Sequence, residues 1–278
     1  MKKWNLIIDV ENCNNCHMCV LAAKDEYVGN CFPGYSEEMP KRGAKWIEIQ
    51  KKERGQSPMI DIAYIPTMCQ HCDEAPCIKA AKNNAVIKRE DGIIIIDPEK
   101  SKGQKQIVES CPHNAISWNE KLNIPQIWSF DAHLLDQGWK TPRAVSVCAT
   151  GAMRAIKTND SEIKELIENE NLEVLNPEQK TKPRIYYKNL YRFNKCFIGG
   201  SIATIRNNIE DCVKNAKIEL YKDGIKINDA LTDDFGDFKF DNLEPNSGKY
   251  TVNISYNEKN KKLDVDLEES KFIGNIYI

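Results

Sequence analysis

A cysteine triplet close to the N-terminus has the spacing of a metal-cluster site. Cys13, Cys16 and Cys19 are separated by two residues each in the stretch CNNCHMC. A bacterial ferredoxin run has a fourth cysteine four residues after the third, and Ala23 stands at that position here. The stretch alone allows three interpretations: a broken iron–sulfur site, a zinc site, or a site whose fourth ligand lies elsewhere in the chain.

A second triplet lies further along the chain and is also incomplete. It consists of Cys69, Cys72 and Cys77. Ala81 takes the position four residues later, and two further cysteines stand alone, Cys111 before a proline and Cys148. In two-cluster ferredoxins the fourth cysteine of a run, which precedes a proline, binds the other cluster. The chain has one distant cysteine for each triplet, so the count predicts eight thiolate ligands for two [4Fe-4S] clusters.

Zinc is the alternative metal, because all four histidines lie near cysteines and Cys₃His is a known zinc site. These histidines are His17, His71, His113 and His133. Zinc knuckles, however, use paired Cys-x-x-Cys modules, whereas a three-cysteine run with a remote Cys-Pro fits an iron–sulfur cluster better. We therefore expect iron–sulfur clusters, with the histidines beside them or at the surface. Cys31, Cys196 and Cys212 are expected to bind no metal.

The composition of the 278-residue chain excludes several classes of function. Its 39 Lys and Arg nearly balance its 41 Asp and Glu, so no basic excess indicates a nucleic-acid partner. No apolar run approaches the roughly 20 residues of a membrane span. The N-terminal stretch MKKWNLIIDVENC does not resemble a secretory signal. We expect a cytoplasmic protein, in which eleven cysteines favour metal binding over disulfides.

Cysteine density and strand patterns divide the chain and predict an α+β protein. Short strands, turns and nine of the eleven cysteines predict an iron–sulfur domain over residues 1–158. A helix from Asp160 and a basic, aromatic connector that docks on another surface make up residues 159–195. Residues 196–278 alternate apolar and polar residues between turn signals, which predicts a small antiparallel all-β sandwich.

Several stretches resemble a family of electron-transfer subunits. The two triplets are accompanied by REDGIIIIDPEKSKG, AHLLD and TKPRIYYKNLYRFNK. Together they resemble the ferredoxin-like subunits that accompany molybdopterin enzymes of the dimethyl-sulfoxide-reductase superfamily, in particular the small subunits of pyrogallol–phloroglucinol transhydroxylases. The resemblance implies a double ferredoxin-like iron–sulfur domain. In the C-terminal region, GDFKFDNLEPNSGKYTVNI resembles prealbumin-like modules, so the fold class is a double ferredoxin-like domain followed by an all-β prealbumin/Ig-like sandwich.

The resemblance also implies how the cysteines pair. The family has four cysteine motifs, in which the first crosses with the fourth and the second with the third. By this rule Cys148 completes the first triplet and Cys111 the second. One cluster is then bound by Cys13, Cys16, Cys19 and Cys148. The other is bound by Cys69, Cys72, Cys77 and Cys111.

The resemblance also implies that two further clusters of the family are absent here, because all four cysteine positions of each hold other residues. The positions of one hold Ala81, Ser101, Gln104 and Ile107. The positions of the other hold Ala23, Trp128, Asp131 and Ala144. Thiolates without a metal in a cavity are reactive. Loss of all four cysteines of a cluster is therefore more stable than loss of some of them, and the Trp128 side chain can fill the space of the lost cluster. Ala23 then marks a different cluster and is not damage to the Cys13 site.

The resemblance implies a non-catalytic iron–sulfur subunit of a molybdenum transhydroxylase that turns pyrogallol into phloroglucinol. Its partner would be a large catalytic subunit that carries molybdopterin guanine dinucleotide, in a heterodimer or a larger assembly. Two alternatives stay open. One is the small subunit of a related reductive dehydroxylase or hydroxylase that needs external electrons, and the other is a scaffold subunit whose clusters are structural.

Overall fold

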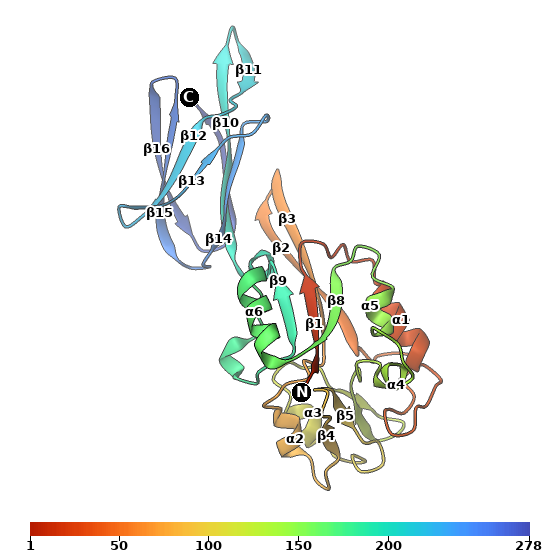
Figure 1. The fold of residues 1–278 in the computed structure, drawn as a ribbon. Helices are drawn as coiled ribbons and strands as arrows, with labels where there is room; N and C mark the ends of the chain where they lie inside the picture. Colours follow the sequence, from red (N-terminus) through yellow and green to blue (C-terminus); the bar gives the residue numbers. More distant parts are fainter. The chain divides into compact units, whose positions relative to one another are not determined.

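The chain folds into two units, as the computed structural model of all 278 residues shows (Figure 1). The first unit comprises residues 1–51 and 64–190, and the second comprises residues 52–63 and 191–278. The second unit thus takes in the outer part of a hairpin formed by β2 (Ile47–Gln56) and β3 (Met59–Met68). The predicted functional domains, 1–158, 159–195 and 196–278, stay predictions.

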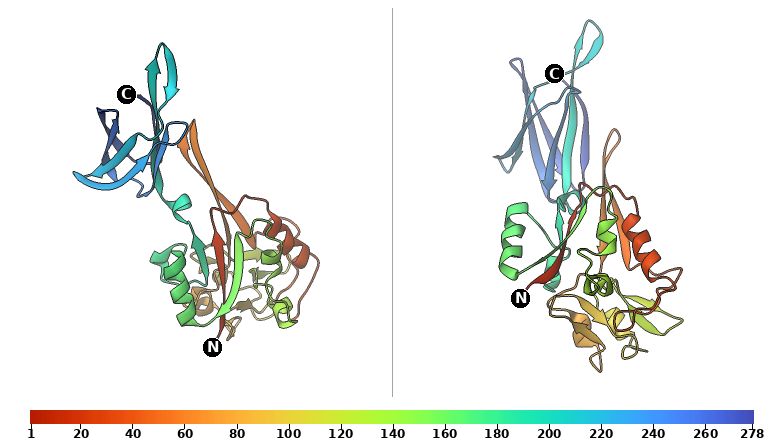
Figure 2. Two further views of the ribbon diagram at one scale, coloured as in Figure 1. Left: turned by 45° about the horizontal axis from the view of Figure 1, so that its top comes forward. Right: turned by 45° about the vertical axis from the view of Figure 1, so that its right-hand side comes forward.

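A three-stranded sheet with the order β8-β1-β9 organises the first unit. Its central strand β1 (Lys3–Asp9) pairs antiparallel with β8 (Met153–Thr158) and parallel with β9 (Ile185–Lys188). The predicted helix is α6 (Asp160–Glu170), which begins after Asn159 with a reciprocal capping box to Glu162. Its apolar side packs on this sheet (Figures 1 and 2). The aromatic connector therefore supplies a strand, β9, to the sheet.

The rest of the first unit consists of short elements joined by tight turns. The helices are α1 (Met18–Tyr27), α2 (Pro76–Ala80), α3 (Gln106–Glu109), α4 (Ala132–Asp136), α5 (Arg143–Ser146) and the 3₁₀ turn η1 (Pro177–Gln179). The strands form two small hairpins, β4 (Val86–Lys88) with β5 (Ile94–Ile96), and β6 (Ser117–Asn119) with β7 (Ile124–Gln126). Many turns use residues at positive φ, which short polar side chains such as Asn tolerate.

A buried polar network joins α1 to the segment around α4 and α5. The Asp131 carboxylate accepts hydrogen bonds from Tyr27 Oη (2.8 Å), Trp128 Nε1 (2.8 Å) and the Arg143 backbone amide (2.8 Å). Trp128 is fully buried and lies 5.0 Å, centroid to centroid, from Phe130. Burial raises the pKa of the Asp131 carboxyl, while the hydrogen bonds from Tyr27 and Trp128 favour its ionised form.

The second unit is a β-sandwich of two four-stranded sheets around one apolar core (Figure 2). One sheet has the order β13-β12-β15-β16, and in the other β10 pairs with β11, β14 and β17. The strands are β10 (Cys196–Arg206), β11 (Ile209–Cys212), β12 (Lys217–Lys222), β13 (Ile225–Leu231), β14 (Asp237–Leu243), β15 (Gly248–Tyr256), β16 (Lys259–Leu267) and β17 (Lys271–Tyr277), preceded by α7 (Tyr191–Asn194). The predicted antiparallel pairing holds except between β10 and β17, which are parallel.

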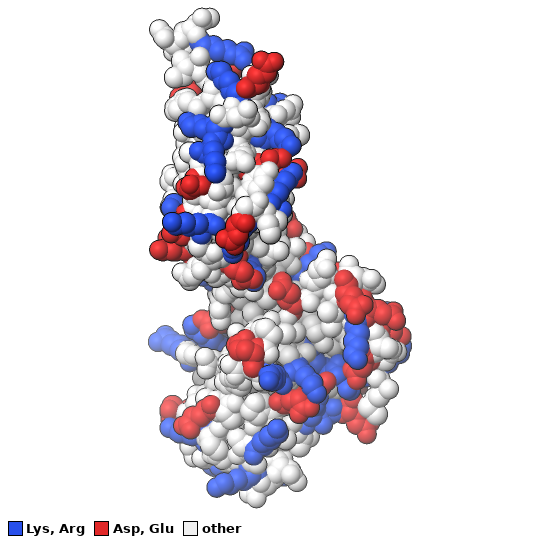
Figure 3. All heavy atoms as spheres, turned by 90° about the vertical axis from the view of Figure 1, so that its left-hand side faces the viewer, with Lys and Arg blue, Asp and Glu red and all other residues white.

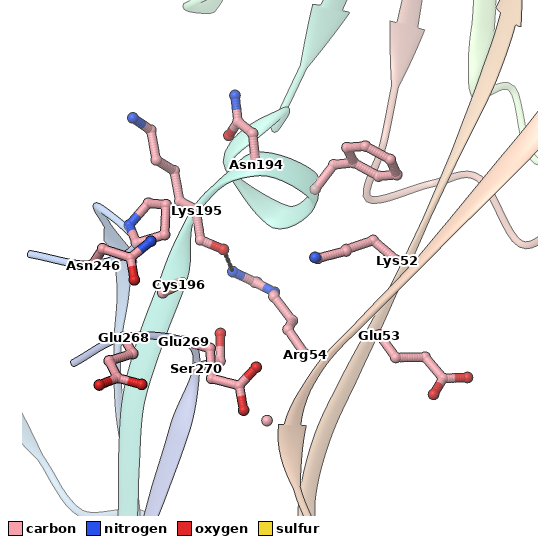
Figure 4. A pocket seen from close by; sticks show the side chains of 13 residues that line it. Lys52, Glu53, Arg54, Asn194, Lys195, Cys196, Asn246, Glu268, Glu269 and Ser270 are labelled. Carbon is pink, nitrogen blue, oxygen red and sulfur yellow. Dashed lines mark hydrogen bonds between the residues drawn. The ribbon is translucent and has the colours of Figure 1, made fainter.

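A buried arginine holds the outer hairpin residues within the second unit. Arg54 is 5% exposed and donates to Asp61 and Asp241, and its Nη1 also reaches the Lys195 carbonyl at 3.3 Å (Figure 4). The guanidinium lies 5.4 Å from the Phe197 ring centroid. Arg54 and Lys195 border a cavity of about 600 Å³. Because each donor of Arg54 meets carboxylate or carbonyl oxygen, the buried charge is compensated.

The surface carries both signs of charge. On the face in Figure 3, Lys and Arg are interspersed with Asp and Glu, without an extended area of one sign. None of the helices combines the length and the apolar composition that a membrane crossing requires.

Replacement of the buried indole tests the role of the Asp131 network. Trp128→Ala should destabilise the protein by about 3–5 kcal/mol, since it opens a cavity and removes a donor to a buried carboxylate. Trp128→Phe keeps most of the ring volume and should cost only about 1–3 kcal/mol. Urea denaturation under anaerobic conditions, followed by far-ultraviolet circular dichroism, measures both. Equal stability of Trp128→Ala and the wild type would show that the indole does not support this core.

The Arg54 cluster leads to a second stability prediction. Arg54→Met should lower the free energy of unfolding of the second unit by about 3–5 kcal/mol, because it leaves Asp241 without its buried cation. Lys239→Met is the matched control: Lys239 pairs with the same carboxylate at 3.0 Å but is exposed, and its loss should cost about 0–1 kcal/mol. Similar costs for the two variants, read by the same denaturation, would contradict the assignment.

Candidate iron–sulfur sites

Four cysteines of the first unit line one small cavity. These are Cys69, Cys72, Cys77 and Cys111, here called the second quartet. The first three are less than 9% exposed and Cys111 is partly exposed. The rest of the lining is mainly apolar, with isoleucines from β5 and from the segments beside β6 and β7, and the cavity volume is about 20 Å³. The sequence therefore folds so that four thiols face a common, water-poor space.

Three local structures place the second quartet. Cys69 follows the end of β3, and Cys77 lies in α2, which begins at Pro76, where proline suits the first helical position. Cys111 follows α3 directly. Between Cys69 and Cys72 the backbone turns through His71 at φ 45°. The imidazole is fixed because its Nδ1 accepts a hydrogen bond of 3.0 Å from the Ile94 amide.

The thiols of the second quartet are hard to ionise without a compensating charge. Burial, with the neighbouring thiols of Cys111 and Cys72, raises the pKa of Cys77 to about 12. Burial raises the pKa of Cys69 as well, and Cys77 and Cys111 add to that effect. Four thiolates in this cavity therefore need a positively charged group at its centre, which is what the iron of a cluster supplies.

The first quartet is Cys13, Cys16, Cys19 and Cys148, and strand register brings its distant member to the triplet. In the β1–β8 ladder Ile8 stands opposite Met153. Cys13 lies five residues after Ile8, and Cys148 lies five residues before Met153. Burial raises the pKa of Cys19 to about 11, with smaller contributions from the thiols of Cys13, Cys16 and Cys148. The four thiols are therefore close enough to interact.

The two quartets differ in exposure. In the first quartet Cys16 is exposed, Cys13 and Cys148 are partly exposed, and only Cys19 is buried. Cys19 lies within α1, and Cys148 follows α5, so the two helices carry ligand candidates from both ends of the iron–sulfur region. The first quartet thus lies at the surface of the unit, whereas the second lies inside it.

The three remaining cysteines lie outside both quartets. Cys31 donates a hydrogen bond to Glu37 at 3.0 Å, Cys196 begins β10, and Cys212 ends β11. Two of the four histidines have other partners, since His113 Nε2 lies 2.9 Å from Thr181 Oγ1 and His133 Nε2 lies 2.9 Å from Glu26. No three His, Cys, Asp or Glu side chains are arranged to hold a single metal ion.

The positions of one absent family cluster are filled by a hydrogen-bonded glutamine and apolar packing. Gln104 Oε1 accepts from the Lys82 amide at 2.8 Å, and its Nε2 donates to the Lys100 carbonyl at 2.7 Å. Ser101 and Ile107 are fully buried, and Ala81 packs against the same core as the second quartet.

The positions of the other absent cluster hold the Asp131 network. Trp128 and Asp131 are joined by the hydrogen bond described above, and Ala23 and Ala144 are buried on α1 and α5. The sequence indicated that Trp128 could fill this space. It did not indicate Tyr27, whose hydroxyl binds Asp131 and which carries no motif of its own.

Comparisons with known proteins identify iron–sulfur relatives of the chain. Residues 60–158 match the 4Fe-4S dicluster domain family. The chain is 42% identical over 262 residues to the pyrogallol hydroxytransferase small subunit of Pelobacter acidigallici, which covers 93% of each chain. It is 29% identical over 212 residues to a putative dimethyl sulfoxide reductase iron-sulfur subunit of Halobacterium salinarum, covering 68% of this chain and 80% of the relative. It is 26% identical to a tetrathionate reductase subunit of Salmonella typhimurium, with coverage of 68% and 73%.

The predicted family is thereby confirmed, and with it a ferredoxin-like domain that binds iron–sulfur clusters. The full-length match to a hydroxytransferase small subunit includes the C-terminal β-sandwich. This chain belongs to the iron–sulfur small subunits of the molybdenum oxidoreductase family, alongside the pyrogallol hydroxytransferase small subunit.

Proposed function

We propose that this chain is the small subunit of a molybdenum hydroxytransferase that converts pyrogallol into phloroglucinol. The observation that carries the proposal is the 42% identity over 93% of both chains to a subunit of that name. Catalysis takes place in a large partner subunit that holds molybdopterin guanine dinucleotide. This chain contributes no catalytic residue, and its role is to bind clusters beside that partner in a heterodimer or a larger assembly.

The chain binds two [4Fe-4S] clusters in this proposal. Cluster A is held by the first quartet and cluster B by the second. The donor sets fit, because each contains four thiols and a cubane takes four thiolates. A three-cysteine run with a remote Cys-Pro suits a cluster better than zinc, whose knuckles use paired Cys-x-x-Cys modules. Each cluster supplies one-electron transfer when bound.

The two quartets differ in their access to solvent and to a partner subunit. The isoleucines around the second quartet exclude water from cluster B. Exposure of Cys16 leaves cluster A at the surface, where a partner subunit can approach it. A reducing compartment such as the cytoplasm suits a chain whose cysteines bind clusters rather than form disulfides. Residues 196–278 form a prealbumin/Ig-like domain, supported by two hairpin-rich sheets around one core.

Two other functions are kept because specific observations favour them. Relatives named as reductase subunits favour a reductive dehydroxylase or hydroxylase that draws electrons from outside. At two of the family's cluster positions, Gln104 and the Asp131 network stand in place of cysteines. Electrons then have no continuous series of clusters to follow, which favours a scaffold subunit whose clusters are structural. Pyrogallol and phloroglucinol are isomers, so their interconversion needs no external electrons, and two clusters suit it better than a long relay. Clusters that resist reduction in the complex would favour the scaffold.

Metal analysis of the complex tests the cluster count. The complex with its large subunit, purified anaerobically from its host, should contain about eight iron per small subunit, with molybdenum and little zinc. Inductively coupled plasma mass spectrometry reads the three metals together. Zinc without iron would overturn the redox function, and about twelve iron would show that a third cluster is present.

Ligand substitution tests the crossing of the quartets. Cys148→Ser should remove cluster A and leave about four iron per small subunit, because a cluster that lacks one thiolate is labile. Cys111→Ser should remove cluster B to the same extent. Cys31→Ser is the control, since Cys31 lies outside both quartets, and should keep all the iron. Full iron occupancy in Cys148→Ser would contradict the assignment of cluster A.

A further inference from the structure

Lys88 is bound tightly to the backbone that carries the second quartet. It is the last residue of β4, and its side chain is 19% exposed. Its Nζ donates to the carbonyls of His71 (2.8 Å), Cys72 (2.9 Å) and Gly92 (3.1 Å). The ammonium also lies 2.9 Å from Asp73 Oδ1. A lysine with this many internal partners on one cysteine loop is more than a solvated surface charge.

The β4–β5 hairpin holds the Cys69–Cys72 loop from two sides. Lys88 stands opposite Ile94 in the hairpin register. The Lys88 side chain binds the carbonyls of the loop, while the Ile94 amide binds the His71 ring. His71 is at φ 45°, an uncommon conformation for a residue other than glycine. The hairpin therefore fixes the loop geometry on which the thiols of Cys69 and Cys72 depend.

The charges around the second quartet sum to a positive value. Lys88 and Arg184 both pair with Asp73, and Arg184 also reaches Asp160, which lies further out and is 56% exposed. Lys3 pairs with Asp160 at 2.9 Å. Next to the cysteine loop, three cations stand against two carboxylates: Lys88 and Arg184 with Asp73, and Lys182 with Glu74. The Lys88 ammonium lies closest to the cysteines, because it donates to the Cys72 carbonyl itself.

The charges near the first quartet are arranged differently. The nearby cation Arg143 is bound by two carboxylates, those of Asp25 and Glu26. Arg143 therefore does not bind the backbone of the cysteine loop as Lys88 does. Lys24 and Lys41 also border the surface beside Arg143, so cations lie near the first quartet as well. What distinguishes Lys88 is its contact with the backbone of the cysteine loop.

We propose that Lys88 is a positioning residue for cluster B that also raises its reduction potential. The inference rests on the proposed assignment of cluster B to the second quartet. One added electron makes a cluster more negative, so a nearby positive charge stabilises the reduced form. Net charge and hydrogen bonding are among the levers that set cluster potentials. Lys88 supplies both, through its ammonium and through the carbonyls that it holds.

The test is an anaerobic redox titration of the complex, followed by electron paramagnetic resonance. In Lys88→Gln, which removes the charge but keeps a donor, the ratio of reduced to oxidised cluster B at a fixed potential should fall about tenfold or more. Lys88→Arg keeps the charge and should restore most of the ratio. Lys121→Gln is the matched control, because Lys121 is an exposed lysine that pairs with Glu38, and should change neither cluster. The signal lost in Cys111→Ser identifies cluster B.

An unchanged ratio in Lys88→Gln with full iron content would overturn the inference. If Lys88→Gln loses cluster B, the variant Asp73→Asn tests the effect of charge instead, because it keeps Lys88 and removes the neighbouring negative charge. It should raise the ratio, and an unchanged or lower ratio would overturn the inference. Iron content separates this result from failure of the proposed function: full iron in Cys111→Ser would refute the assignment of cluster B itself, whatever the titration shows.

Discussion

The fold of the first unit depends on one constraint, the gathering of four thiols from distant segments around one small space. Each quartet combines a local triplet with a cysteine far along the chain, and closing such loops has an entropic cost. The β1–β8 ladder closes this loop for the first quartet. Ile8 and Met153 are paired in the ladder, and Cys13 and Cys148 each lie five residues along the chain from that pair. Short helices and turns then suffice for the remaining ligands.

The same constraint explains how the absent clusters are replaced. A cluster position without iron must not keep isolated thiols or open space. Here one position is closed by Gln104, whose amide is bound by backbone groups, and the other by Trp128 and Tyr27 around Asp131. Both fillings satisfy their polar atoms internally. The first unit therefore keeps a packed interior at these positions.

The sequence predicted what spacing can encode. Cysteine intervals indicated two quartets, the capped helix at Asp160 could be located, and strand alternation indicated the C-terminal β-sandwich. Long-range partners carry no such local signal. The aromatic connector could not reveal that Ile185–Lys188 joins β1 as a parallel strand, and Arg54 gave no sign that it would bind Asp241. The contacts of Lys88 with the cysteine loop could not be predicted either, because a single lysine after two apolar residues is common in strands.

Exposure and charge together give the two quartets unequal properties. The first lies at the surface beside carboxylates that bind Arg143, and the second lies in an apolar shell beside Lys88 and Arg184. The apolar shell keeps water from the second quartet and by itself disfavours added negative charge there, whereas the positive charges of Lys88 and Arg184 oppose that effect. Under the proposed function this suits a reaction without net consumption of electrons. A protected site that retains an electron can keep the partner subunit in an active redox state, whereas a respiratory enzyme needs an unbroken relay to pass electrons on.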